Sequence, residues 1–151
     1  MKLADTNVLL HAVNKAAPQH ATARTWLAAA LVEPGGVGLA WSSLIGFVRL
    51  STRPGIMKPA LSTEEALAPV QRWLAAPAVS VLHPGDQHLA VLARLLIGAG
   101  TAGNLTNDAH LAALAIEHGA TLVSFDRDFA RCRWCWTRAW PSLSWSAGPR
   151  S

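Results

Sequence analysis

Cysteine and charged side chains are scarce in this 151-residue sequence. The two cysteines, Cys132 and Cys135, form one C-x-x-C pair. A structural zinc site would need two more good ligands, and the sequence has no second such pair. A thioredoxin-like redox pair usually opens a helix after an early strand, whereas this pair lies near the C-terminus among Arg and Trp residues. We therefore expect two free thiols.

Long apolar runs are also absent. None approaches the roughly 20 residues that a membrane-spanning helix needs, and Asp5 falls where a secretory signal would need an apolar stretch. Only 15% of the residues are charged and 51% are hydrophobic, a composition typical of folded rather than disordered chains. We expect a single cytoplasmic domain with no membrane partner.

Acidic residues are fewer than basic ones, 9 against 13, which gives a formal net charge of +4. A mildly basic surface suits an anionic partner such as nucleic acid, although many basic proteins bind none. Composition alone therefore leaves the partner open.

Short apolar segments alternate with helical patterns along the chain, which predicts an α/β domain with a mostly parallel sheet. A capping-box pattern at Ser62 and Glu65 marks one helix start, and Pro18 marks another. Strands are expected at 2–5, 37–40, 79–82 and 121–125. Helices are expected at 6–13, 18–31, 62–75 and 104–118, and Gly119 is the glycine that ends the last of these. A further helix is opened by Ser42 or Ser43. Another is opened by Pro84 and Gly85, with Asp86 as its cap.

Four aspartates stand at or just after predicted strand ends or at a helix start. Asp5 ends the first strand, Asp108 lies in the first turn of a helix, and Asp126 and Asp128 follow the last strand. The carboxyl ends of parallel strands and the following helix starts converge on one edge of the sheet. Such a carboxylate cluster suits Mg²⁺ or Mn²⁺ and metal-assisted phosphoryl transfer.

Each of these acids also has a purely structural interpretation. Asp108 could complement a helix dipole, and Asp126 and Asp128 could be turn residues. Asp5 is harder to explain in this way, because it lies between apolar segments and lone buried charges are avoided. The other acids are expected to be solvated at helix ends or faces: Glu33, Glu64, Glu65 and Glu117. No histidine is expected to be catalytic, and His110 points to a different helix face from Asp108.

The same residues resemble a known family. The segment Asp5-Thr6-Asn7-Val8-Leu9 resembles the opening motif of PIN domains. Residues 104–115 and 124–129 resemble the third and last acidic motifs of VapC toxins, and the likeness spans about residues 2–131. The motifs are weak singly but specific together, because they occur in order and at domain-appropriate spacing.

The resemblance implies a PIN-like three-layer α/β/α sandwich over residues 1–131. It implies a toxin of a type II toxin–antitoxin system, a Mg²⁺- or Mn²⁺-dependent endoribonuclease that cuts tRNA or a ribosomal RNA loop. A homodimer silenced by a VapB-like antitoxin is also implied. By analogy, Asp5, Asp108 and Asp126 would hold the metal, with Asp128 supporting the site. Residues implied to orient carboxylates, water or phosphate are Asn7, Asn104 and Ser124.

Two features depart from the family pattern. VapC proteins commonly carry a Glu three residues before the Arg that corresponds to Arg49, and here Gly46 stands in its place. This loss predicts one metal, or weak metal binding, and leaves open a non-catalytic module that binds RNA or an antitoxin. Arg49 is expected to bind phosphate or an antitoxin carboxylate, or else to be a solvated helix residue.

The second departure is the Arg- and Trp-rich tail at residues 132–151, which does not resemble the apolar edge-strand segment of relatives. A reading-frame shift or strain-specific extension would explain it; if native, its Arg and Trp side chains could hold single-stranded RNA.

Two other classes of protein fit this sequence less well. A dehalogenase-type phosphatase would need Asp in place of Asn7, and a nucleotide-binding domain would need a Gly-rich loop after the first strand.

Overall fold

The computed structural model describes residues 1–126, and its centre is a four-stranded parallel sheet in the order β3-β2-β1-β4. The strands are β1 (Lys2–Ala4), β2 (Val37–Ala40), β3 (Val79–Leu82) and β4 (Thr121–Val123). Leu3 pairs with Gly38 of β2 and with Leu122 of β4, so β1 is central. The prediction of an α/β fold with a mostly parallel sheet is confirmed, and every pairing in this sheet is parallel.

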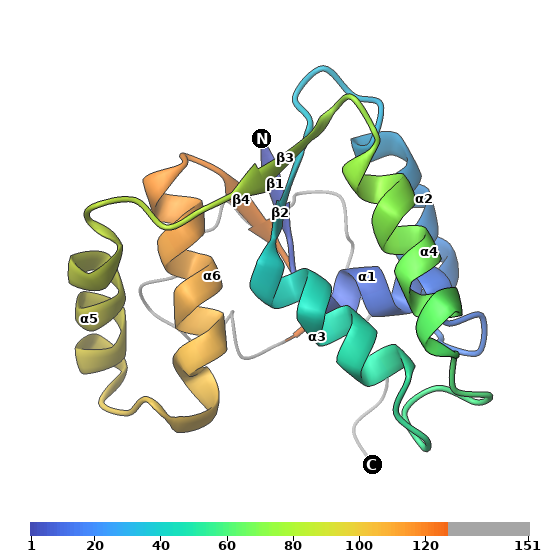
Figure 1. Cartoon of the computed structure of the whole chain (residues 1–151). Coiled ribbons are helices and arrows are strands. Elements are labelled where there is room, and N and C mark those ends of the chain that lie inside the picture. Colours follow the sequence, from blue (N-terminus) through green and yellow to red (C-terminus); the bar gives the residue numbers. More distant parts are fainter. Residues whose placement is uncertain (127–151) are drawn as a thin grey trace, which may run out of the picture.

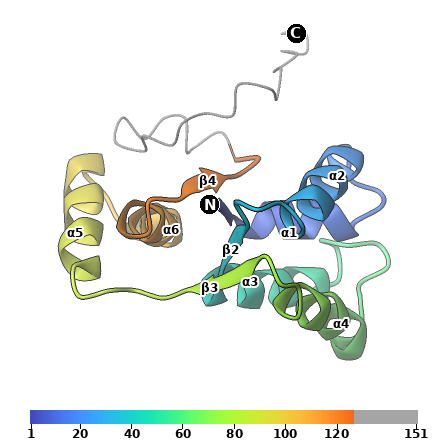
Figure 2. The same cartoon turned by 90° about the horizontal axis from the view of Figure 1, so that it is seen from above.

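Helices cover both faces of the sheet and make three layers (Figures 1 and 2). One face carries α1 (Thr6–Val13), α2 (His20–Ala30), α3 (Trp41–Ser51) and α4 (Thr63–Leu74). The other carries α6 (Thr106–Glu117), with α5 (His88–Ala99) packed on its outer side. A short 3-10 turn, η1 (Gly103–Leu105), precedes α6.

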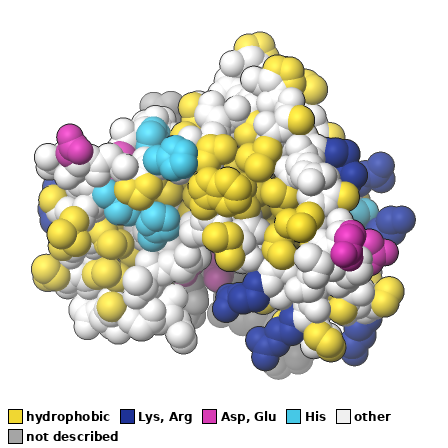
Figure 3. All heavy atoms as spheres, in the orientation of Figure 1, with side chains coloured by type: hydrophobic (Ala, Val, Ile, Leu, Met, Phe, Trp, Pro, Cys, Tyr) yellow, Lys and Arg dark blue, Asp and Glu magenta, His cyan; other side chains and the backbone are white. Residues whose placement is uncertain are grey.

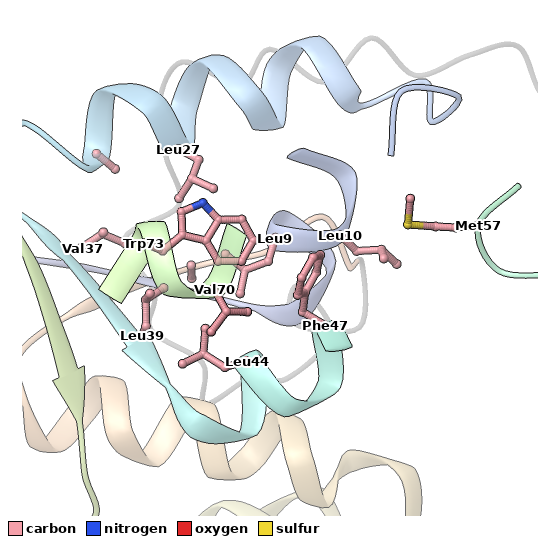
Figure 4. Packing of buried hydrophobic residues seen from close by; sticks show 12 residues of the cluster. Leu9, Leu10, Leu27, Val37, Leu39, Leu44, Phe47, Met57, Val70 and Trp73 are labelled. Carbon is pink, nitrogen blue, oxygen red and sulfur yellow. The ribbon is translucent and has the colours of Figure 1, made fainter. Parts of the chain in front are cut away.

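Alternation along the strands divides the core in two, because successive strand side chains point to opposite faces. Leu3 and Leu122 pack with α6, whereas Ala4, Val37 and Leu39 pack with the four-helix side. Figure 4 shows the larger cluster, in which the rings of Phe47 from α3 and Trp73 from α4 meet edge to face with centroids 5.1 Å apart. Such pairs add about 0.5–1.5 kcal/mol beyond burial.

A glycine in β2 permits close packing at the sheet centre. A Cβ added to Gly38 would lie 2.6 Å from Cδ1 of Leu82 on the neighbouring strand. Any larger residue would therefore displace a buried leucine, which explains a glycine in a strand where its entropy cost is unfavourable.

Most element boundaries lie within a few residues of their predicted positions. The capping box at Ser62 and Glu65 is present, and Gly119 ends α6 with a φ of 58°. Other helix starts were predicted wrongly. The helix after β2 begins at Trp41 with Ala40 as its N-cap, so that Ser43 is buried inside it. Gln87 rather than the exposed Asp86 precedes α5.

The first helix starts at Thr6 as predicted, whereas the start of the second helix and the ends of two strands shift. Pro18 precedes α2 by two residues instead of opening it, and β4 ends at Val123 rather than at residue 125. Asp5 leaves β1 and becomes the N-cap of α1. In residues 1–126, no helix combines the length and apolar character needed to cross a bilayer.

Candidate functional site at the carboxyl edge of the sheet

Asp5 stands at the junction between the central strand and α1. Its backbone N–H donates to the carbonyl of Val123 in β4 at 3.0 Å, which continues the β1–β4 ladder one residue beyond the strand. Its side chain then caps α1, since Oδ1 accepts from the Thr6 N–H at 2.6 Å. A carboxylate at a helix N-terminus is stabilised by the free N–H groups and the helix dipole.

A hydroxyl from the neighbouring strand holds the other carboxylate oxygen. Ser124, directly after β4, donates from Oγ to Oδ2 of Asp5 at 2.7 Å. The same Oγ accepts from Asn7 Nδ2 and from the backbone N–H of Asp126, both at 2.9 Å. Asn7 Oδ1 in turn accepts from the Phe125 N–H at 3.0 Å. Two segments more than 110 residues apart are thus locked together around one carboxylate.

Asp5 is buried, with 5% of its surface exposed. Burial raises the pKa of its carboxyl group, the hydrogen bonds from Ser124 and Thr6 oppose this, and the negative charge of Asp126 raises it further. The pKa is raised overall, so desolvation outweighs the hydrogen bonds. Buried acids with perturbed pKa values are frequent at functional sites, and oxygen donors of this kind suit Mg²⁺ or Mn²⁺.

The remaining predicted site residues lie on α6, η1 and α3, and one falls outside the described residues. Asp108 is half-buried in the first turn of α6, and α6 runs antiparallel to the strands, so this turn lies at the carboxyl edge. Asn104 is exposed in η1 just before it. Arg49 is exposed in the last turn of α3, at the helix end away from the sheet. Asp128 falls outside the described residues, as do Cys132, Cys135 and the rest of the tail.

Position 46, where the family commonly has Glu, directly faces the start of α1. A Cβ added to Gly46 would lie 2.7 Å from Oγ1 and 3.0 Å from Cγ2 of Thr6, the residue after Asp5. Thr6 Oγ1 also donates to the carbonyl of Ser43 at 3.4 Å. The space beside Asp5 on this side is therefore filled by a threonine side chain, and a carboxylate at position 46 would need Thr6 to move.

The sequence pattern missed two features of the structure. Thr6 was read only as part of a motif, yet it supplies both the N–H to Asp5 and the packing against Gly46. Glu117 was predicted to be solvated, which is wrong: its side chain is 10% exposed and accepts from His88. In residues 1–126, no three His, Cys, Asp or Glu side chains are already placed to hold a metal ion.

The sequence matches the PIN domain family over residues 2–134. Two curated relatives come from Mycobacterium tuberculosis. Ribonuclease VapC37 is 48% identical over 131 residues, covering 87% of this chain and 91% of the relative. Ribonuclease VapC33 is 40% identical over the same length, covering 87% and 92%.

Solved structures agree on the fold at low sequence identity. The crystal structure of Mycobacterium tuberculosis VapC20, described as a sarcin–ricin loop cleaving toxin, has a TM-score of 0.68 at 20% identity and covers 88% of this chain and 95% of that chain. The VapBC2 complex of Rickettsia felis, bound to a promoter DNA fragment, gives 0.60 at 20% identity, with 87% and 92% covered. Family match, relatives and topology agree: this chain belongs to the PIN-domain family, in its VapC branch.

Proposed function

We propose that this chain is the toxin of a type II toxin–antitoxin pair and a metal-dependent endoribonuclease that cuts a structured RNA, a tRNA or a ribosomal RNA loop. The observation that carries this is the buried Asp5, held by Ser124 and Thr6 at the carboxyl edge with a second acid, Asp126, close enough to raise its pKa. The names of VapC37 and VapC33 support a ribonuclease. An RNA substrate also places the activity in the cytoplasm.

The donor set fits a hard divalent cation. Asp5 and Asp126 supply carboxylate oxygens, and we place Asp108 as the third ligand and Asp128 as a supporting acid. A bound Mg²⁺, or Mn²⁺ in its place, would polarise the phosphate. It would also lower the pKa of a water, so that this water could lose a proton more readily at neutral pH. The position where a fourth acid would stand is Gly46, packed against Thr6, and this favours one ion over two.

The remaining residues position groups around the carboxylates. Ser124 holds Asp5 in one rotamer, and Asn7 holds Ser124, so that the Asp5 oxygens need no reordering when a cation binds. Asn104 lies exposed beside the first turn of α6, where an amide can donate to an RNA phosphate. Arg49 is assigned to a phosphate or an antitoxin carboxylate at the outer end of α3.

Two kinds of protein partner accompany this function. Complexes named VapBC2 and VapBC-1 share the fold, which supports a VapB-like antitoxin for this chain. A homodimer is supported by exposed apolar residues: Trp41 is 49% and Ile45 is 62% exposed, one turn apart on α3. Figure 3 shows apolar side chains gathered between α3 and α6 on this side of the molecule.

RNA cleavage by the purified full-length chain tests the proposal. We expect a tRNA and ribosomal RNA panel to be cut with Mg²⁺ or Mn²⁺ and not with EDTA. Asp5→Asn should lower the rate at least a hundredfold, because the buried carboxylate loses its charge. Asp86→Asn, which changes an exposed acid of the same type, should cut at the wild-type rate. Cleavage that survives Asp5→Asn would refute the nuclease assignment.

The second candidate is a non-catalytic module, favoured by the single observation that Gly46 offers no side chain to a ligand. In that case the panel would show RNA bound but uncut with either metal. Binding measured by gel shift in the same samples therefore separates the two functions.

A further inference from the structure

A second cluster of chemically capable side chains lies on the opposite layer from Asp5, between α5 and α6. The facing nitrogens are Nε2 of His88, the first residue of α5, and Nδ1 of His110 in α6, 2.9 Å apart. The ring centroids are 4.9 Å apart and the planes are inclined by 74°, so the rings meet edge to face rather than stacking. Figure 3 shows histidine side chains gathered on the surface over these two helices.

A carboxylate fixes the far side of this pair. Glu117, at the end of α6, accepts from Nδ1 of His88 at 2.6 Å, and the two side chains are only 10% and 12% exposed. The loop after β3 closes over them, since a Cβ added to Gly85 would lie 3.1 Å from Oε1 of Glu117. Histidines that bind metals characteristically have their other ring nitrogen held by a carboxylate in this way.

The hydrogen-bond pattern assigns the protons. Because Glu117 accepts from Nδ1–H of His88, a neutral His88 presents the lone pair of Nε2 to its partner. His110 then donates its Nδ1–H into that lone pair. If His110 adopts its other tautomer, with the proton on Nε2, the lone pairs of both facing nitrogens become available to a metal ion.

We propose that His88 and His110 form a binding site for a single transition-metal ion of the zinc class, separate from the carboxylate site. Imidazole nitrogen suits zinc, cobalt, nickel and copper ions, whereas Mg²⁺ prefers oxygen. Zinc–nitrogen bonds of about 2.0–2.1 Å in tetrahedral geometry place two ligand nitrogens about 3.3 Å apart. The two nitrogens therefore need to separate by about 0.4 Å, and the rings need to turn until both lone pairs point at one ion.

The site is open, because two imidazoles leave coordination positions to water. Among residues 1–126, no third His, Cys, Asp or Glu side chain is placed to complete the set. Binding would join α5, whose only buried residue is Val91, to the helix that carries Asp108. The proposal rests on contacts between α5 and α6 and does not depend on the nuclease assignment.

Titration of the EDTA-treated full chain with Zn²⁺ by calorimetry tests this. The background is the Cys132→Ser/Cys135→Ser double variant, because thiols also bind zinc. With excess Mg²⁺ present to occupy the carboxylate site, we expect one Zn²⁺ per chain with a Kd of about 10 µM or tighter. His88→Gln and His110→Gln should each weaken binding at least tenfold, and His20→Gln, on the other side of the sheet, should not. Asp5→Asn should also bind as wild type, which separates this site from the carboxylate edge.

A second experiment uses only the wild-type chain, so its result does not depend on whether the histidine variants fold. It measures how far Zn²⁺ protects each histidine from chemical modification. Diethyl pyrocarbonate modifies free imidazole nitrogens, and mass spectrometry locates each modified histidine. Zn²⁺ should suppress modification of His88 and His110 and leave His20 unchanged. No binding in the double-cysteine background, equal binding by the histidine variants, or no selective protection would each overturn the proposal.

Discussion

Asp5 shows how a buried, charged side chain lowers the stability of this fold. Asp5 accepts hydrogen bonds from Thr6 and Ser124, and even so its pKa is raised, because burial outweighs them and Asp126 adds to the effect. The ionised form is therefore less favourable in the folded chain than in water. Ionised Asp5 therefore lowers the stability of the fold, and acids with perturbed pKa values of this kind cluster at functional sites.

Asp5→Asn should therefore stabilise the metal-free protein at neutral pH. A raised folded-state pKa means that the folded chain binds the proton more tightly than the unfolded chain. Wild-type stability then falls as pH rises above the unfolded value of about 3.9, and the deficit persists at higher pH. The variant has no such deficit, and a gain of about 1 kcal/mol would raise Tm by roughly 2–4 °C.

Thermal unfolding in EDTA at several pH values measures this effect. The gap between Asp5→Asn and wild type should be largest near pH 7. It should close as pH falls below the unfolded value of about 3.9, where the Asp5 carboxyl is protonated in both the folded and the unfolded chain. Asp86→Asn, at an exposed site, should show no gap at either pH. A less stable Asp5→Asn protein at pH 7 would show that the charge-assisted bond from Ser124 outweighs burial.

The contact between Gly46 and Thr6 makes a second prediction. Alanine normally improves a helix interior by about 1 kcal/mol over glycine. Here its Cβ would lie 2.7 Å from Thr6 Oγ1, and such overpacking costs about 1–3 kcal/mol, so Gly46→Ala should destabilise the fold or leave it unimproved. In a Thr6→Ala background the obstacle is gone, and the same change should stabilise. Urea unfolding of the four proteins in the cycle gives the coupling, and a coupling near zero would contradict it.

Among the helices, α4 is the one whose start the sequence specifies most directly. Ser62 Oγ accepts from the Glu65 N–H at 3.1 Å, and the Glu65 carboxylate accepts from the Ser62 N–H at 2.7 Å. Ser62→Ala should lower the free energy of unfolding by about 0.5–2 kcal/mol, as the loss of an N-cap side chain does elsewhere. Urea denaturation measures it, with the neighbouring exposed Thr63→Ala as the matched control.

Helix α5 depends on side-chain contacts for its attachment. It packs on α6, Val91 is its only buried residue, and Leu89 and Ile97 are 76% and 80% exposed. Glu117→Ala removes the acceptor that orients His88, so amide hydrogen exchange in α5 should quicken at least tenfold while exchange in α1 stays unchanged. Glu64→Ala, at an exposed first-turn acid of α4, is the control. Unchanged α5 exchange would mean that apolar packing alone holds the helix.

At the scale of single helices and strands, the sequence predicts features that depend on neighbouring residues. Capping residues, apolar periodicity and the position of Asp5 act over a few neighbours, so most elements and the burial of Asp5 could be predicted. Ser43 looked like a cap because serine caps helices, yet tertiary packing buries it inside α3. The pairing of Glu117 with His88 joins residues 29 apart, and no pattern within one helix reveals it. The lack of a Glu at position 46 is visible in the sequence, whereas the contact between Gly46 and Thr6 arises only from the tertiary fold.

Across the whole described chain, the sheet separates two unequal layers of helices. The four-helix layer holds the larger core, while the opposite layer is α6 with α5 outside it (Figure 2). The carboxylate network sits at the edge where both layers meet, since Asp5 leads into α1 and Asp108 begins α6. A partner that bridges the starts of α1 and α6 would therefore contact both sides of the site at once.

Self-association through α3 is a prediction from the apolar residues left exposed there. Trp41 and Ile45 are one turn apart, and burying two such side chains would contribute a few kcal/mol, about 1.5–3 for each. A twofold interface presents the same patch twice, so one substitution places two charges opposite each other. Ile45→Lys should therefore convert a dimer to a monomer, measured by light scattering during gel filtration.

A matched change elsewhere separates loss of the interface from general effects of charge. Leu89→Lys adds the same lysine at a more exposed apolar position on α5, and it should leave the molecular mass at the dimer value. If both variants remain dimeric, α3 is not the contact; if the wild type is a monomer at all concentrations tested, the homodimer itself is refuted. Monomeric Ile45→Lys that still cuts RNA would show in addition that one chain contains the whole catalytic site, as the contacts of Asp5 within a single chain predict.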